Sequence, residues 1–325
     1  MSAIKKDLDI IGFGALNFDE LYMIEEFPSP GDEIVIKDSD QGPGGSAANT
    51  IIGLARLRLK TGVIGTLSFD SRGSIILKDF ENHAVNTEGL SITATGQTGT
   101  VIGFVDKKGE RILHVYPGVN DLLKIQRISM EYGKRARWIH LSSFVGDEQL
   151  HEQAKFVEDL RKEDLGARFS LSLGMIYARK KLENLKPILK NCEILFCTEK
   201  EIEILMGTDF KDAFRSLLGI GCKTIAITRD SRGCYVASHD EEFSSPAFKV
   251  NDVVDVTGAG DAFAAGFLYG FLKRESLRKC AAYGNYLASR CITKLGARRG
   301  LVYSLKGFRN HIADLKALEE PIKAQ

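Results

Sequence analysis

The stretch Asp255–Phe263 (DVTGAGDAF) places three small residues before a carboxylate at the start of an apolar run. Gly258, Ala259 and Gly260 allow a ligand to approach the main chain, and a helix that begins there directs free amides and its positive dipole end at the same point. The pattern therefore predicts an anion site. Asp261 lies beside it, where a carboxylate repels a bound phosphate unless it takes a proton from an attacking hydroxyl. The structural alternative is only a well-capped helix.

A second glycine cluster lies at Gly42–Leu57 (GPGGSAANTIIGLARL). Gly44 and Gly45 can bring backbone amides against a polar ligand, and Asn49 offers both a donor and an acceptor to hydroxyl groups. Apolar residues follow at helical spacing, so the structural alternative is a turn that leads into a buried helix.

Short strand-like runs alternate with amphipathic, helix-like segments along most of the chain. The runs cover residues 8–15, 61–67, 136–144, 167–174, 192–198 and 223–229. Such alternation predicts an α/β fold in which helices cover both faces of a mostly parallel sheet. No repeat or linker marks a boundary, so we expect a single domain over residues 1–325.

Two segments break this alternation, residues 19–42 and 98–120. Both are predicted to form strand pairs joined by Gly and Pro turns, with no helix between the strands. We expect a small β-sheet that acts as a lid, because ligands of open α/β sheets bind at the carboxyl ends of the strands. Exposed edges of such a sheet favour a homodimer in which two lids pair.

The composition excludes several classes of function. The 325 residues carry 44 basic and 43 acidic side chains, a net charge of +1, so no sustained positive field favours nucleic acid as a partner. No run approaches the roughly 20 apolar residues of a membrane span. Six cysteines are scattered without a CxxC pair, as expected of buried thiols in a reducing cytoplasm.

Together the two glycine clusters resemble the signatures of the PfkB, or ribokinase-like, family of ATP-dependent kinases. DVTGAGDAFAAGFL (residues 255–268) fits the C-terminal signature, whereas GGSAAN resembles the N-terminal one with Ile51 where a small residue, Ser or Thr is usual. Further similar segments keep the family order from about Gly12 to Gly300: LNFDEL, GER followed by YPGVND, TEKE, ITRDSRG and GNYLASRCITKLGA.

The resemblance implies a ribokinase-like three-layer sandwich with a β-sheet lid, and ATP and Mg²⁺ as cofactors. It implies that Asp261 is the catalytic base and that the three small residues before it form the anion hole. The remaining implied positions are Asp19, Gly44, Gly45 and Asn49 for substrate hydroxyls, Thr228 and Gly233 for the nucleotide loop, and Asn285 beside the adenine.

Three positions depart from the family pattern. The metal and phosphate motif Asn-x-x-Glu is Thr198 to Glu201 here, which keeps the metal-site carboxylate but replaces the amide of the phosphate-binding residue with a hydroxyl. Asp230 stands where Gly is usual, and an acid near ATP phosphates must point away or meet Arg229 or Arg232. Asp255 and Thr257 resemble monovalent-cation ligands, yet Gly300 replaces a Ser of that loop, which leaves a K⁺ requirement open.

The sequence thus predicts a kinase that transfers the γ-phosphoryl group of ATP to a hydroxymethyl group of a sugar, a small-molecule partner. A nucleoside of the adenosine type is the main alternative. A phosphosugar ranks third, because Ser46 stands where some relatives carry Lys. An NAD-dependent oxidoreductase ranks last, since Asn17 replaces the third glycine of a GxGxxG pattern.

Overall fold

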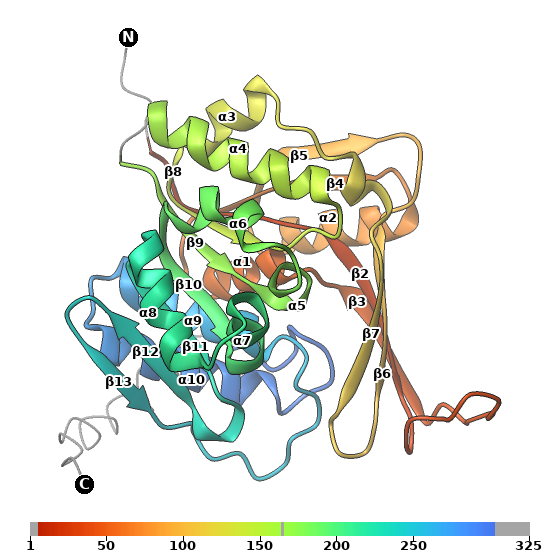
Figure 1. The fold of residues 1–325 in the computed structure, drawn as a ribbon. Coiled ribbons are helices and arrows are strands. Elements are labelled where there is room, and N and C mark those ends of the chain that lie inside the picture. The colour runs from red at the N-terminus through yellow and green to blue at the C-terminus, as the bar shows by residue number, and fades with distance from the viewer. Residues whose placement is uncertain (1–5, 164–165, 303–325) are drawn as a thin grey trace, which may run out of the picture.

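A large sheet forms the centre of the protein, in a computed structural model that describes residues 6–163 and 166–302 (Figure 1). Its nine strands are β1 (Leu8–Phe13), β4 (Thr61–Ser68), β5 (Asn86–Thr93), β8 (Ala136–Ser142), β9 (Arg168–Ser172), β10 (Cys192–Thr198), β11 (Thr224–Thr228), β12 (Cys234–Ser238) and β13 (Glu242–Ser245). They lie in the order β13-β12-β11-β10-β9-β8-β1-β4-β5. All six runs predicted from the sequence form strands, and the strands from β5 to β11 are parallel.

Helices cover both faces of this sheet. One face carries α1 (Ser46–Arg56), α2 (Ser71–Asn82), α9 (Ala259–Leu272) and α10 (Leu277–Cys291). The other carries α3 (Arg127–Lys134), α4 (Asp147–Glu163), α5 (Gly174–Ala178), α6 (Leu182–Leu189), α7 (Glu199–Met206) and α8 (Phe210–Ile220). Short 3₁₀ turns occur at η1 (Gly118–Leu122) and η2 (Asp230–Arg232). The predicted three-layer α/β sandwich is confirmed.

Helix α9 is apolar on nearly all sides because it lies in the core rather than on the surface. The ring of Phe196 on β10 packs against Phe263 and Phe267 of α9, with centroids 6.2 and 5.5 Å apart. Gly53 of α1 lets that helix approach closely, since a Cβ there would lie 2.9 Å from the Cβ of Ala265. The start of α9 is therefore fixed by packing against both the sheet and α1.

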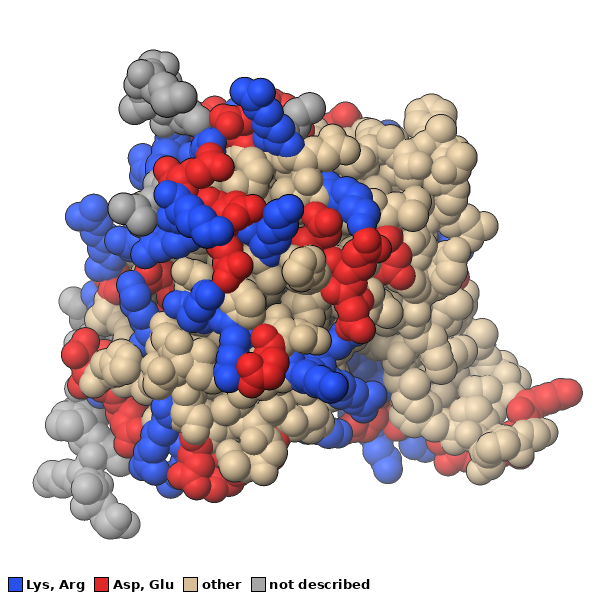
Figure 2. All heavy atoms as spheres, turned by 45° about the horizontal axis from the view of Figure 1, so that its top comes forward, with Lys and Arg blue, Asp and Glu red and all other residues tan. Residues whose placement is uncertain are grey.

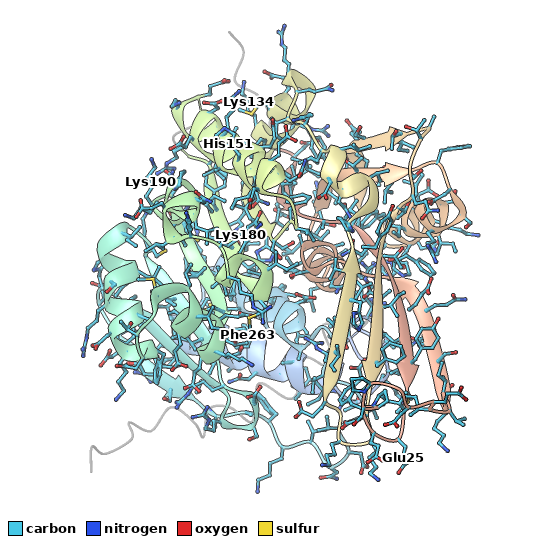
Figure 3. The ribbon with its side chains drawn as sticks, turned by 45° about the vertical axis from the view of Figure 1, so that its right-hand side comes forward. Glu25, Lys134, His151, Lys180, Lys190 and Phe263 are labelled. Carbon is cyan, nitrogen blue, oxygen red and sulfur yellow. The ribbon has the colours of Figure 1, made fainter. Side chains whose placement is uncertain are left out.

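The two segments that break the alternation form a separate four-stranded sheet, which projects to one side of the core (Figure 1). Its strands are β2 (Asn17–Met23), β3 (Asp38–Pro43), β6 (Gly99–Val105) and β7 (Arg111–Tyr116), in the order β3-β2-β6-β7. Figure 3 shows Glu25 at the outer end of this sheet, away from Phe263 in the core. The prediction of a small β-sheet in these segments is confirmed.

Strand register divides the small sheet into two faces. Asp19 pairs with Val101 and Val101 with Val115, while Arg111 pairs with Val105, so Asp19, Val115 and Arg111 share the face turned toward the core. Ion pairs to the core join Glu20 to Arg72 and Asp40 to Arg299.

Basic and acidic side chains intermingle over the core in Figure 2, and fewer charges lie toward the right, where the small sheet is. This view shows no broad basic face of the kind that nucleic acid requires. In the described part of the chain, no helix has the length and apolar character to cross a bilayer.

Candidate active site

The N-termini of α1 and α9 meet at the carboxyl edge of the large sheet. Gly258 caps α9 in the left-handed region, with φ of 77°, and a Cβ at this position would lie 2.4 Å from the Cβ of Ala297. Only glycine fits this turn without strain. The two helices therefore point the positive ends of their dipoles at one place.

Asp261, in the first turn of α9, is held by two side chains of α1. The hydroxyl of Ser46 donates to its Oδ1 at 2.7 Å, and Asn49 Nδ2 donates to its Oδ2 at 2.8 Å. Burial raises the pKa of Asp261, and these two hydrogen bonds partly offset the rise. The two hydrogen bonds fix the orientation of this carboxylate.

The amides before Asp261 differ in their availability. The Ala259 amide donates to the Val256 carbonyl at 3.2 Å and so belongs to the turn. The amides of Gly260 and Asp261 lie in the first helical turn, where no intrahelical carbonyl can accept from them. Gly260 is exposed. Of the three small residues, Gly260 is thus best placed to offer its amide to an anion.

Asp19 of β2 packs directly over the second glycine cluster. A Cβ at Gly44 would lie 2.1 Å from Asp19 Oδ2, and Gly45 adopts φ of 93° with Ala15 O where a side chain would be. Oδ1 of Asp19 is buried and has no hydrogen-bond partner among the described residues. Burial raises the pKa of Asp19 to about 7. An unpaired acceptor here suits a ligand hydroxyl.

Asn49 was predicted to hold substrate hydroxyls, and both ends of its amide already contact protein. Nδ2 donates to Asp261, and Oδ1 accepts from Nε of Arg298 at 2.7 Å. The structure thus brings Asn49 to Asp261, the predicted base, and a direct contact of Asn49 with substrate stays a prediction.

The predicted nucleotide residues gather at the ends of β10 and β11. Thr198 caps α7 in a capping box: its hydroxyl accepts from the Glu201 amide at 3.2 Å, and Glu201 Oε2 accepts from the Thr198 amide at 2.9 Å. Thr228 ends β11, and its hydroxyl reaches the Cys197 carbonyl at 3.4 Å. The hydroxyl that replaces the family amide is therefore occupied by the helix cap.

Gly233 and Asn285 both contact the segment after β13. A Cβ at Gly233, where φ is 87°, would lie 2.1 Å from Ser245 O. Asn285 Nδ2 donates to the carbonyls of Ser245 and Pro246 at 3.1 and 3.0 Å. Asn285 thus braces this loop, and contact with adenine stays a prediction.

Asp230 forms an ion pair with neither Arg229 nor Arg232. Both arginines pair with Glu199 instead, and Asp230 is exposed with φ of 50°. The acid at this position therefore points to solvent rather than into a local ion pair.

The predicted metal residues do not form a preassembled cage. Within residues 6–163 and 166–302, no three His, Cys, Asp or Glu side chains cluster as metal ligands. Asp255 is buried and accepts from the amides of Thr257 and Gly296, each at 2.8 Å. Thr257 Oγ1 is buried without a partner in the described chain, which fits a cation ligand. Burial raises the pKa of Glu201, the remaining predicted ligand.

Sequence reasoning missed two residues of this site. Arg298 is buried against Asn49, and Ser46 was considered only as a position where relatives carry Lys. Arg111 of the small sheet lies near enough that its charge lowers the pKa of Asp19, Glu201 and Asp261, against the larger effect of burial. The basic pair in LGARRG was the only sequence signal for Arg298.

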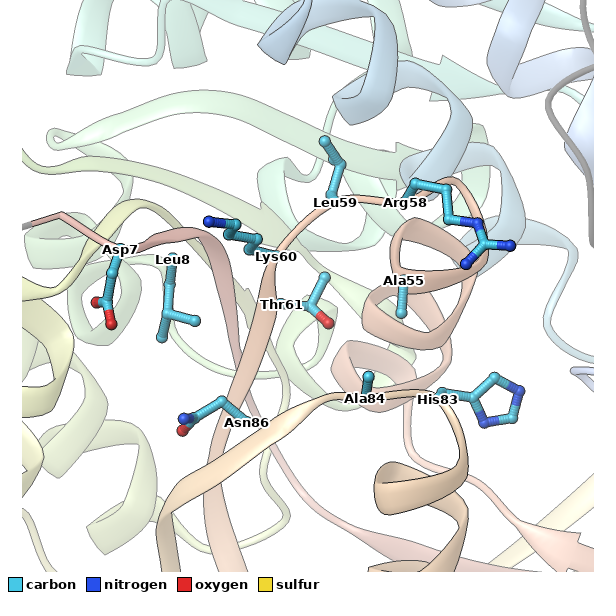
Figure 4. A pocket seen from close by; sticks show the side chains of 10 residues that line it. All are labelled: Asp7, Leu8, Ala55, Arg58, Leu59, Lys60, Thr61, His83, Ala84 and Asn86. Atoms are coloured by element: carbon cyan, nitrogen blue, oxygen red, sulfur yellow. The ribbon is translucent and has the colours of Figure 1, made fainter.

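A separate hollow of about 380 Å³ lies at the amino ends of β1, β4 and β5 (Figure 4). Arg58, Lys60, Thr61 and His83 are among the residues that line it. It contains none of the predicted site residues, which lie at the carboxyl edge.

The raised pKa of Asp19 predicts how ligand-free stability depends on pH. Because the folded pKa of about 7 exceeds the ordinary 3.8, the folded protein binds more protons than the unfolded chain between these values, and stability falls as pH rises through that window. One such group contributes a slope of at most about 1.4 kcal/mol per pH unit. Asp19→Asn should flatten this part of the profile in denaturant melts from pH 4.5 to 7.5, whereas Asp38→Asn, an exposed change in β3, should not. Equal slopes for all three proteins would contradict the assignment.

The chain is similar to known proteins in both sequence and fold. The sequence model of the pfkB family carbohydrate kinases matches residues 8–302. An uncharacterized sugar kinase of Archaeoglobus fulgidus is 38% identical over 257 residues, which cover 78% of this chain and 100% of that protein. The ATP-dependent ribose-1-phosphate kinase of Halopiger xanaduensis is 28% identical, over 89% of this chain and 93% of its own.

A solved structure shares the fold. The nucleoside kinase of Methanocaldococcus jannaschii, described as an archaeal member of the ribokinase family, superposes with a TM-score of 0.78 over 95% of this chain and 99% of its own, at 23% identity.

This chain belongs to the pfkB family of carbohydrate kinases. It is a sugar or nucleoside kinase, a phosphotransferase with an alcohol group as acceptor. The predicted family, fold and reaction class are confirmed, and the oxidoreductase alternative is not supported.

Proposed function

We propose that this protein transfers the γ-phosphoryl group of ATP to a hydroxymethyl group of a sugar. The observation that carries the proposal is the Asp261 carboxylate, oriented by Ser46 and Asn49 at the N-terminus of α9. The Asp19 carboxyl group, whose Oδ1 is unpaired, lies near enough that the charge of Asp261 raises its pKa. A polyhydroxylated ring fits between two carboxylates because its hydroxyls can donate to both.

In this mechanism Asp261 takes the proton of the acceptor hydroxymethyl group. The first amides of α9 neutralise charge on the migrating phosphoryl group, with Gly258 and Ala259 shaping the turn and Gly260 offering its amide. Asp19 and the backbone of Gly44 and Gly45 hold the remaining hydroxyls.

The nucleotide would lie against the predicted loop residues at the ends of β10 and β11. When bound, Mg²⁺ would neutralise negative charge on the ATP phosphates. Among the predicted metal residues, Glu201 is the carboxylate that would hold Mg²⁺. Its burial and the nearby charge of Arg111 agree with this role.

A nucleoside is the second candidate acceptor, and the small sheet favours it. Leu113 and Val115 are 40% and 38% exposed and lie on the same face of the sheet as Asp19. Apolar side chains in that position suit a nucleobase, whose flat faces a plain sugar lacks.

The test is an ADP-release assay with ATP, Mg²⁺ and a panel of pentoses, hexoses, sugar phosphates and nucleosides. We expect the highest kcat/KM with an unphosphorylated sugar and no release after EDTA. A higher kcat/KM with a nucleoside or sugar phosphate would replace the proposed acceptor. No release with any acceptor would overturn the function itself.

The same assay tests a smaller part of the proposal. We propose that a monovalent cation binds at Thr257 and Asp255, so replacing K⁺ with Na⁺ should lower the rate of ADP release. Equal rates with the two ions would refute this cation site. We also propose a cytoplasmic location, which the six buried free cysteines support.

Arg111, which lies on β7 of the small sheet, is expected to assist phosphoryl transfer. Arg111→Met should lower kcat roughly 10-fold or more, because a cation facing the phosphoryl group stabilises charge that develops in the transition state. Steady-state kinetics with the preferred acceptor measure the effect. Lys108→Met removes a cation from the same hairpin and is the control; equal effects of the two changes would contradict a role for Arg111.

We propose further that the small sheet forms a homodimer contact. Its outer face exposes Ile102, Ile112 and Tyr116, which are 39%, 47% and 54% exposed, and β7 is an edge strand. Light scattering should show a dimer that Ile112→Glu converts to a monomer. Ile204→Glu, an exposed change on α7, should leave the dimer intact, and a monomeric wild type would refute the proposal.

A further inference from the structure

Arg298 is a buried arginine whose guanidinium joins three segments far apart in the sequence. Nε donates to Asn49 Oδ1 at 2.7 Å, Nη2 donates to the Gly44 carbonyl at 3.0 Å, and Nη1 pairs with Asp79 of α2. The side chain is only 9% exposed. Burying a guanidinium is costly, and one carboxylate is enough to compensate its charge. The two other contacts both go to the acceptor half of the candidate site.

The contact with Asn49 sets the direction of that amide. A guanidinium only donates hydrogen bonds and a carboxylate only accepts them, so Asn49 must turn its oxygen to Arg298 and its NH₂ group to Asp261. Without Arg298, the Asn49 oxygen loses its charged donor and the amide loses the partner that fixes its orientation.

The contact with Gly44 fixes the loop beneath the acceptor. Gly44 also donates its amide to the Asn17 carbonyl at 2.7 Å, and its missing side chain leaves room for the Asp19 carboxylate. Arg298 thus touches both the loop under Asp19 and the residue that holds Asp261.

We propose that Arg298 is a positioning residue for phosphoryl transfer: it orients Asp261 through Asn49 and holds the Gly44 loop, so that the base and the acceptor site keep a fixed geometry. This inference rests on the proposed function, since it assumes that Asp261 is the base and that the acceptor lies over Gly44. The positive charge also counters the rise that burial causes in the pKa of Asp261 and Asp19.

Kinetics of Arg298→Met test the proposal. We expect kcat to fall roughly 10- to 100-fold, as when a reacting group is misplaced by about 1 Å. The KM for the acceptor should rise while the KM for ATP stays constant, because Arg298 contacts Asn49 and Gly44 of the acceptor half and none of the predicted nucleotide residues. The acid limb of the kcat/KM profile should move to higher pH, since a charge that lowers the pKa of Asp261 is gone.

Three further variants separate positioning from simple stabilisation. Arg298→Lys should return the acid limb to its wild-type pH without restoring kcat, because Lys keeps the charge but not the forked geometry. Asp79→Asn breaks the same ion pair yet leaves the contacts to Asn49 and Gly44, so its kinetic effect should be much smaller. Arg135→Met removes a paired arginine elsewhere and should change only the melting temperature.

If Arg298→Met fails to fold, the double variant Arg298→Met/Asp79→Leu replaces the ion pair with apolar groups and carries the test. Equal kinetic loss in Arg298→Met and Asp79→Asn with an unmoved acid limb would overturn the proposal, as would wild-type kcat in the double variant. A wild type that transfers phosphate to no acceptor would instead refute the proposed function.

Discussion

Asp261→Asn is expected to lower kcat by roughly 10² or more while ATP still binds, which is the scale of positioned general-base catalysis. The change is nearly isosteric. Asn49 can still donate to the remaining oxygen, and the Ser46 hydroxyl can rotate to accept from the new NH₂ group. The start of α9 and its contacts with α1 should therefore persist, and only the proton acceptor is lost.

Steady-state kinetics and ATP titration of the wild type and of Asp261→Asn measure this effect, and circular dichroism checks that the variant is folded. Asp252→Asn removes an exposed carboxylate nine residues earlier and is the matched control, expected within twofold of wild type. Turnover of Asp261→Asn equal to that of the control would mean that another group takes the proton.

Gly260→Ala should lower activity without lowering stability. Beyond its chain neighbours and its own helix backbone, a Cβ here would meet no described atom within 4 Å, and Ala is favoured over Gly in helices by about 1 kcal/mol. The melting temperature should stay or rise. We nevertheless expect kcat to fall roughly 10²-fold, since the methyl group occupies space over the amide that must reach the phosphoryl group.

Gly258→Ala is the comparison for this result. Its Cβ would clash with Ala297 and the backbone there is left-handed, so both stability and turnover should fall. A Gly260→Ala enzyme with wild-type kcat would show that the phosphoryl group does not approach this amide.

Much of the fold could be predicted because its signals are local. Each buried parallel strand appears as an apolar run, and β4 is buried along its whole length, as a central strand must be. The prediction missed β5 at one edge of the large sheet and, at the other edge, β12 and β13, which are antiparallel. The reason for the antiparallel pairing is the short turn at η2, which leaves no room for a crossover helix between β11 and β12.

The site was predictable where its residues form continuous motifs. Gly258 and Asp261 stand within four positions of each other, so their chemistry is visible in the sequence. The contact of Arg298 with Asn49 spans 249 positions, and nothing near Arg298 indicates its partner. Long-range polar contacts of this kind follow from tertiary packing, which a single sequence does not display.

The residues of the candidate site come from two sheets, which has a consequence for ATP hydrolysis in the absence of an acceptor. Asp19 belongs to β2 of the small sheet, whereas the predicted nucleotide residues and Asp261 belong to the large sheet and its helices. We expect a sugar that engages Asp19 to hold the two parts together more firmly than ATP, whose one predicted contact with the small sheet is Arg111. We therefore expect futile ATP hydrolysis to stay slow until an acceptor arrives.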